Sequence, residues 1–217
     1  MLLQAKRIKT LLLVLLLISS FGGRAQAPTA NTEALLVMDM QDSILSFLPS
    51  ARAQELTSQV AKAVAGARQK GVLVIYVRAG FRQGAPEISD NNKFLAAHRE
   101  KYAMGNAAQA LKLTPALAPL AKDIVVDKHR IGAFTGSDLE MLLRAHHIQR
   151  LILCGFATSG VVLTTVREAA DKDFQLTVLS DGCADVDAEV HRVLTTKVFP
   201  SQAEVLPIAQ WLATSPK

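Results

Sequence analysis

The chain has 217 residues, which favours one domain with a single large core, and half of them are apolar, which excludes an intrinsically disordered chain. The formal net charge is +5, but Lys6, Arg7, Lys9 and Arg24 contribute four of these charges within the first 25 residues, which contain no acidic residue. The rest of the chain is therefore close to neutral and has no basic stripe with interleaved aromatic residues, so we expect no nucleic-acid partner.

The first 25 residues have the pattern of an export signal. Basic residues at positions 6–9 precede the apolar run Leu11–Ile18, and small residues then lead to Ala25, the expected cleavage site. The alternative is an uncleaved membrane anchor, but the apolar stretch 11–23 is shorter than the roughly 20 residues that span a bilayer. We expect a signal peptide over 1–25 and a single domain over 26–217, located in the periplasm or outside the cell.

Short apolar runs alternate with helical patterns along the rest of the chain. The expected buried strands are 34–38, 72–77, 124–126, 151–154, 176–179 and 203–206. The expected helices are 50–70, 137–148, 162–172, 187–198 and a last one around Trp211, and the Ser137–Glu140 spacing fits a capping box. Residues 80–119 are rich in glycine and proline, and a loop-rich insertion of that length is more often functional than idle. This order predicts a doubly wound α/β fold, with a mostly parallel six-stranded sheet and helices on both faces.

Polar residues follow several of the predicted strands. They are Asp39, Arg78, Lys128 and the small-residue turn 155–160. Because ligands of such sheets bind beyond the carboxyl ends of the strands, Asp39 and Lys128 are candidates for an acid/base pair. The alternative is that they are ordinary loop ends or a structural ion pair.

The two cysteines give no sign of a metal site or of a required disulfide. Cys154 lies in an apolar run, where a small buried hydrophobic residue is the simplest interpretation, and Cys183 follows a different strand pattern. The segment Gly132–Gly136 lacks the dinucleotide-binding fingerprint. We therefore expect neither a metal nor a nucleotide cofactor.

Three segments together resemble the isochorismatase-like hydrolase superfamily, often called cysteine hydrolases. They are Ala34–Gln41 (ALLVMDMQ), Asp127–Leu139 (DKHRIGAFTGSDL) and Gly155–Thr165 (GFATSGVVLTT), and the likeness covers about residues 31–200. The resemblance implies the fold predicted above, with Asp39 as the catalytic aspartate and Lys128 as the catalytic lysine. Members of the family are commonly homo-oligomers, and the resemblance carries that expectation as well.

The sequence departs from the family at the nucleophile. The position of the family's cysteine is Val161, which has no lone pair with which to attack a carbonyl carbon. The resemblance also implies a cis bond between Phe156 and Ala157, and an oxyanion hole formed by the backbone N–H groups of Ala157 and Val161. Because backbone amides do not depend on the side chain, this polarising part of the site is expected to remain.

Three functions are compatible with such a site. Family members without the cysteine hydrolyse a vinyl ether by using the aspartate as an acid, and the first hypothesis assigns this chemistry to Asp39. The second is hydrolysis of an amide or ester by water that Asp39 activates, and the third is a non-catalytic binding or assembly protein. For a carboxylated small-molecule substrate, the expected binding residues are Arg78 and Arg130, with Arg82 a weaker candidate, and Phe134 of the second segment. The histidines do not reproduce the metal-binding arrangement of the family's nicotinamidases.

Overall fold

The structure is a computed structural model that describes residues 32–103 and 107–214. The signal peptide expected over residues 1–25 lies outside these ranges and stays a prediction. Within the described ranges, no helix has both the length and the apolar character needed to cross a bilayer.

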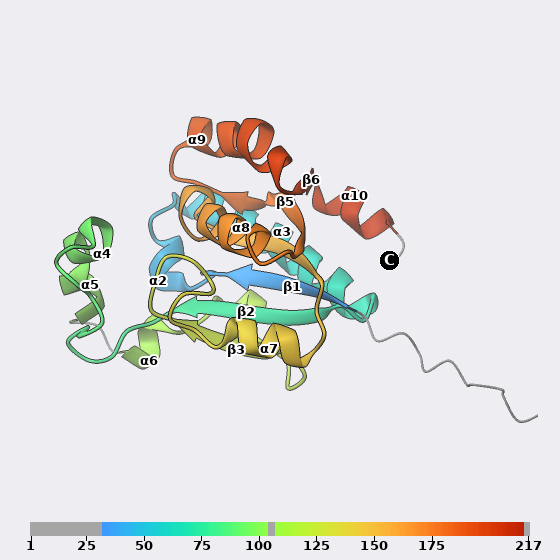
Figure 1. Cartoon of the computed structure of the whole chain (residues 1–217). Coiled ribbons are helices and arrows are strands. Elements are labelled where there is room, and N and C mark those ends of the chain that lie inside the picture. The colour runs from blue at the N-terminus through green and yellow to red at the C-terminus, as the bar shows by residue number, and fades with distance from the viewer. Residues whose placement is uncertain (1–31, 104–106, 215–217) are drawn as a thin grey trace, which may run out of the picture. The chain divides into compact units, whose positions relative to one another are not determined.

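In the described part of the chain, six parallel strands form one sheet in the order β3-β2-β1-β4-β5-β6 (Figure 1). The bounds are β1 Glu33–Met38, β2 Leu73–Ala79, β3 Ile124–Lys128, β4 Arg150–Phe156, β5 Gln175–Ala184 and β6 Glu204–Leu206. This arrangement confirms the predicted doubly wound α/β fold, and every strand pair in it is parallel. One prediction is corrected: β5 runs five residues beyond position 179, so Cys183 lies within a strand rather than after one.

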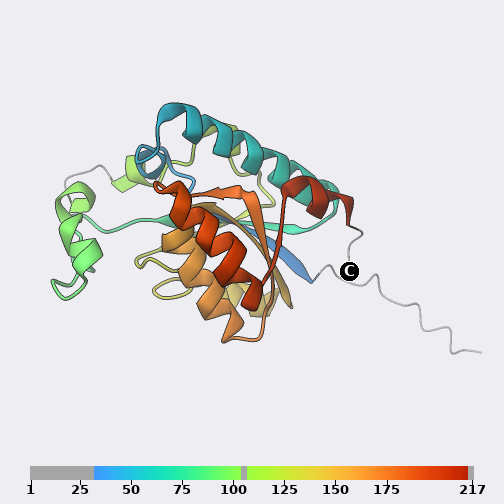
Figure 2. The same cartoon turned by 90° about the horizontal axis from the view of Figure 1, so that it is seen from above.

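Helices cover both faces of the sheet, as Figure 2 shows from above. The long helix α3 (Ser50–Gln69) and α10 (Ile208–Ala213) lie on one face, and α7 (Leu139–Ala145) and α8 (Leu163–Ala170) lie on the other. The helix predicted over 187–198 is present as α9 (Ala188–Val193), continued by η3 (Leu194–Val198) and η4 (Phe199–Ser201).

The alternation of β1 explains why both faces need a helical layer. Leu36 and Met38 belong to the core that includes residues of α7 and α8, while Leu35 and Val37 belong to the core that includes residues of α3 and α10. Successive side chains of a strand point to opposite faces, so a strand that is apolar throughout must be covered on both. All six residues of β1 are buried.

The irregular insertion between β2 and β3 contains short helices. They are α4 (Lys93–Ala97), α5 (Arg99–Ala103), α6 (Ala107–Ala110) and η1 (Pro115–Leu117). Gln41 connects this insertion to the sheet, because its buried side-chain amide donates hydrogen bonds to the carbonyl oxygens of Ala79 (2.8 Å) and Ala110 (2.6 Å).

The strand order reverses direction between β1 and β4, where a doubly wound sheet opens its ligand crevice. The two strands approach closely there at Gly155, which has φ +139°. A Cβ atom at this position would lie 2.0 Å from the carbonyl oxygen of Met38. Neither backbone can move away without disturbing the pairing that places Asp39 at the end of β1.

The Gly155→Ala variant is predicted to lower the free energy of unfolding by about 3 kcal/mol or more, because backbone atoms cannot relax around the added methyl group. Urea unfolding followed by circular dichroism would measure the change. Gly84→Ala is the control: Gly84 also has a positive φ, of +79°, but a Cβ atom there meets nothing within 4 Å. Its cost should stay at about 1–2 kcal/mol, and equal costs for the two variants would contradict the close approach.

Candidate active site

A cavity of about 260 Å³ opens at the carboxyl end of the sheet, beside the switch point. Asp39 follows β1, Lys128 ends β3, and the turn that begins at Ala157 follows β4; all three line this cavity. The remaining wall comes from α2 (Asp42–Leu45) with the loop after it, from the insertion, from the loop after β3 and from the end of β5. The predicted strand-end residues Asp39 and Lys128 therefore meet in one hollow.

The Lys128 ammonium group is buried and fully hydrogen-bonded. Its Nζ atom lies 2.9 Å from Oδ2 of Asp39 and donates to the carbonyl oxygens of Arg130 and Ile131, each also at 2.9 Å. The side chains of Lys128 and Asp39 are only 2% and 10% exposed. Since an ammonium group has three donors, Lys128 has none left for a substrate. Its geometry suits it to hold Asp39 in place rather than to bind a ligand directly.

Asp39 keeps one oxygen without a partner. Its Oδ1 atom is buried and has no hydrogen bond within the described residues, although the residue lines the cavity. Burial raises the pKa of Asp39 above its ordinary value, and the Lys128 charge lowers it by a smaller amount. The residue adopts φ +56°, in the left-handed region that aspartate tolerates better than most residues. Asp39 is thus a constrained carboxyl group whose pKa lies above its ordinary value.

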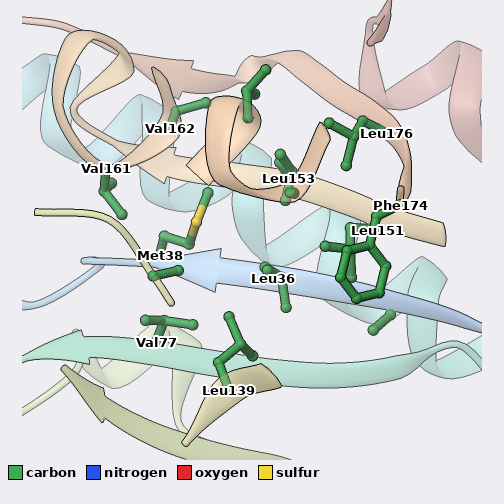
Figure 3. Close-up of a cluster of buried hydrophobic side chains, with 14 of the residues drawn as sticks. Leu36, Met38, Val77, Leu139, Leu151, Leu153, Val161, Val162, Phe174 and Leu176 are labelled. Carbon is green, nitrogen blue, oxygen red and sulfur yellow. The ribbon is translucent and has the colours of Figure 1, made fainter. Parts of the chain in front are cut away.

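The turn after β4 has the form that the resemblance implied. The Phe156–Ala157 peptide bond is cis, and residues Thr158–Val162 form one turn of π-helix (η2) before α8 begins. Val161 lies in this turn and lines the cavity, and it also belongs to the buried cluster drawn in Figure 3. The position of the family's nucleophile is therefore filled by an apolar side chain that packs into the core.

Neither cysteine takes the place of the missing thiol. Cys154 and Cys183 are both free and buried, and neither lines the cavity. The Cys154 sulfur donates to the carbonyl oxygen of Leu36 at 3.5 Å. Burial raises the pKa of Cys183 to about 12 and that of Cys154 well above its ordinary value, so both stay protonated and unreactive.

The turn is held from the side of β5 by residues that the sequence interpretation missed. Asp185 is buried, and its carboxylate accepts the backbone N–H of Ser159 at 2.7 Å. The hydroxyl of Thr158 donates to the carbonyl oxygen of Ala184 at 2.9 Å and lies 2.8 Å from Nδ1 of His191. The sequence around Asp185 gives no sign of these contacts, which depend on the tertiary approach of β4 and β5.

Arg78 and Phe134, two of the predicted substrate-binding residues, do not line the cavity, and neither does the weaker candidate Arg82. Arg78 does not line the cavity, because its guanidinium forms a two-pronged ion pair with Asp127, the residue opposite it on β3, at 2.7 and 3.0 Å. Phe134 is a core residue that stacks on Phe174 with ring centroids 6.1 Å apart. Arg82 also lies outside the cavity and pairs with Glu87.

Arg130 lines the cavity, and its role in binding a substrate stays a prediction. One of its guanidinium nitrogens, Nη1, donates to the carbonyl oxygen of His129 at 2.6 Å, and within the described residues the side chain forms no ion pair. The guanidinium therefore retains donors for an anionic ligand, in addition to the unpartnered oxygen of Asp39.

The insertion supplies an aromatic wall that no sequence pattern indicated. Phe81, Phe94 and Tyr102 line the cavity together with Phe47 and Phe156. Burial raises the pKa of Tyr102, and the neighbouring charge of Asp39 raises it further, so the Tyr102 phenol keeps its proton at neutral pH. A search of the described residues for three or more metal-ligating His, Cys, Asp or Glu side chains gathered in one place finds no such group.

The Lys128→Met variant should lower the free energy of unfolding at pH 7 by about 3–5 kcal/mol, because it leaves the Asp39 carboxylate buried without its partner. Lys128 lowers the pKa of Asp39, so its removal raises that pKa further. A group with a raised folded pKa stabilises the protein below its unfolded pKa and loses this contribution as the pH rises through the folded value. The difference in unfolding free energy between the wild type and Lys128→Met should therefore shrink as the pH falls toward the raised pKa of Asp39. Urea unfolding at several pH values would measure this difference.

Lys172→Met is the matched control, because Lys172 pairs with the exposed Glu140. It should leave the free energy of unfolding nearly unchanged. If Lys128→Met changed the free energy of unfolding as little as Lys172→Met does, at every pH, the result would contradict the buried pair.

Comparisons with known proteins agree with this geometry. Residues 33–210 match the family described as the isochorismatase domain. The chain is 31% identical over 189 residues to the uncharacterized isochorismatase family protein YecD of Escherichia coli O157:H7, and the alignment covers 84% of this chain and 96% of that protein. It is 28% identical over 180 residues to the ureidoacrylate amidohydrolase RutB of Acinetobacter baylyi, and this alignment covers 73% of this chain and 74% of that protein.

Among solved structures, a putative isochorismatase hydrolase from Oleispira antarctica superposes with a TM-score of 0.71 and 27% identity, over 87% of this chain and 100% of that one. The resemblance found in the three sequence segments is thereby confirmed. With its parallel sheet, its cis turn and its paired Asp39 and Lys128, the chain belongs to the isochorismatase family of hydrolases.

Proposed function

We propose that this protein hydrolyses a small substrate without a covalent enzyme intermediate, with Asp39 as the group that transfers the proton. The observation that carries the proposal is the distribution of hydrogen bonds in the buried pair. All three donors of the Lys128 ammonium group form hydrogen bonds, to Asp39 and to two carbonyl oxygens, whereas Oδ1 of Asp39 has no partner among the described residues. That oxygen is buried and its residue lines the cavity, so a substrate bound there would meet the Asp39 carboxyl group.

The reaction that best fits these groups is the hydrolysis of an enol ether. The protonated carboxyl of Asp39 gives its proton to the terminal carbon of the C=C bond, and the electron pair of that bond forms the new C–H bond. The other carbon becomes an oxocarbenium centre, and a water molecule adds to it and loses a proton. The hydroxyl proton of the resulting hemiketal then passes to the alkoxy oxygen while the bond between that oxygen and the carbon breaks, so an alcohol leaves and a carbonyl product remains. The proton released by water restores the Asp39 acid, so no thiol is needed.

The electrostatics of the site support the acid role. Burial, the larger influence, raises the pKa of Asp39, and general acids work best when their pKa approaches the working pH. The cavity wall is mostly apolar around this carboxyl group, which disfavours its ionised form. Activity is therefore expected to fall as the pH rises through the pKa of Asp39.

The turn amides support a second candidate, the hydrolysis of an amide by Asp39-activated water. The turn that contains Ala157 and Val161 lines the cavity, where its backbone N–H groups would polarise a substrate carbonyl group, and the relative RutB is named an amidohydrolase. In this reaction Asp39 acts in its ionised form, so activity should rise rather than fall with increasing pH. The direction of the pH profile separates the two candidates.

The Asp39→Asn variant should lose at least about 100-fold in kcat on a substrate drawn from a panel of enol ethers, amides and esters, because the amide can neither give nor accept the proton. Asp127→Asn is the matched control, since Asp127 forms a partly exposed ion pair with Arg78 and neither residue lines the cavity. Iodoacetamide should leave the wild-type rate unchanged. Loss of activity on alkylation, or an active Asp39→Asn variant, would reject the mechanism. No product from any member of the panel would favour the non-catalytic alternative.

The Val161→Cys variant should gain an activity on amides that iodoacetamide abolishes, because the thiol then lies at the family's nucleophile position beside Asp39 and the turn amides. Val162→Cys is the control: Val162 is the next residue of the same turn but does not line the cavity. Initial rates with and without alkylation would measure the gain. An alkylation-insensitive Val161→Cys enzyme with the wild-type rate would show that the remaining machinery does not support thiol chemistry.

A further inference from the structure

The mouth of the cavity is unusually apolar for a surface. Phe47, Phe94 and Val186 line the cavity, and they are 43%, 52% and 61% exposed. They come from three separate places in the chain: the loop after α2, helix α4 and the loop after β5. We call these three residues the rim. Large apolar side chains that gather around the opening of a binding site indicate a ligand that covers them.

Paired aromatic rings continue this surface into the cavity. Phe94 packs against His98 with ring centroids 4.7 Å apart, and Phe81 packs against Tyr102 at the same distance. All four residues line the cavity, and all four come from the insertion between β2 and β3. Aromatic walls favour a planar aromatic ligand, because ring pairs gain energy beyond the burial of their area.

The charged groups of the cavity have unequal capacity for a ligand. Lys128 has used its three donors, and the Asp185 carboxylate accepts the backbone N–H groups of Ser159 at 2.7 Å and Asp187 at 3.4 Å. Arg130 donates one hydrogen bond to a carbonyl oxygen and forms no ion pair among the described residues. Of the charged residues that line the cavity, Arg130 is therefore the one with donors left for an anionic group, as far as the described residues show.

We propose that the cavity binds an elongated aromatic monoanion, whose charged group meets Arg130 and whose apolar end extends out over the rim. This inference rests on the proposed function for its assignment of the ligand as substrate. The cavity, at about 260 Å³, lies below the roughly 300–1,000 Å³ of typical small-molecule sites, so a ligand with more than one ring continues outward. The continuation lies on Phe47, Phe94 and Val186, which removes their exposed surface from water.

Calorimetry with unreactive carboxylic acids tests the ligand class without turnover. The series is propionate, 3-phenylpropionate and 3-(biphenyl-4-yl)propionate, together with the uncharged 3-phenylpropanol. We expect 3-phenylpropionate to bind at least tenfold more tightly than propionate or 3-phenylpropanol. The biphenyl acid should bind at least fivefold more tightly still, because its second ring reaches the rim.

Two variants assign these gains to residues. Arg130→Gln should bring 3-phenylpropionate to the affinity of 3-phenylpropanol, and Phe94→Ala should remove the added affinity of the biphenyl acid while the 3-phenylpropionate affinity changes less. Arg192→Gln on α9 and Met141→Ala, which is 65% exposed on α7, are the charged and apolar controls. Both should bind the series as the wild type does.

Several results would overturn the inference. They are equal affinities for propionate and 3-phenylpropionate, equal affinities for the acid and the alcohol, or a biphenyl acid that gains nothing. A further one combines two observations: the wild type is a dimer that the Phe94→Asp substitution dissociates, and the substitution leaves the affinity for the biphenyl acid unchanged. A second copy of the chain, and not a ligand, would then cover the rim. Binding without hydrolysis of any panel member would support this ligand class and reject the proposed function separately.

Discussion

The site depends on one buried ammonium group whose hydrogen bonds are complete. Taking Lys128 and Asp39 out of water costs several kcal/mol per ion, and such a pair persists only when its geometry is good and the other donors are satisfied. The carbonyl oxygens of Arg130 and Ile131 meet this requirement, and they also fix the loop that follows β3. Because all three donors of the lysine are occupied, one carboxylate oxygen of Asp39 is left without a partner, and the proposed function assigns the proton transfer to this carboxyl group.

The parallel sheet is what brings this pair together, and that much could be read from the sequence. Apolar runs that end in Asp39 and near Lys128 place both residues at the same edge, since the carboxyl ends of parallel strands coincide. The strand β2 separates β1 from β3, yet Ala79 at its end is small and pairs in register with Lys128, so the long lysine side chain passes over it. The alternating burial of β1 likewise followed from its composition.

Contacts between distant segments could not be read in the same way. Arg78 was expected at the cavity because it ends a strand, but the register of β2 and β3 places Asp127 directly opposite, and the two charges satisfy each other. The Ser137–Glu140 capping box is incomplete, because Glu140 pairs with Lys172 beyond α8 instead. Phe134 was assigned from its place in a motif, which does not reveal the side of the loop that packs on Phe174. The aromatic wall comes from an insertion without periodicity, so only tertiary structure shows that Phe81 and Phe94 line the same cavity as Asp39.

Under the proposed function, valine in place of a thiol at position 161 changes the chemistry of this fold but not its frame. Valine and cysteine are both small side chains that bury readily, so Val161 joins the core cluster while the turn around it keeps its cis bond. The carboxyl group, its lysine partner and the turn belong to the backbone course of β1, β3 and β4 rather than to the exchanged side chain. Under the proposed function, the protein retains a proton-transfer group, Asp39, in a mostly apolar cavity. Reactions that begin with protonation of the substrate need no thiol, so the proposal narrows the reaction class to these.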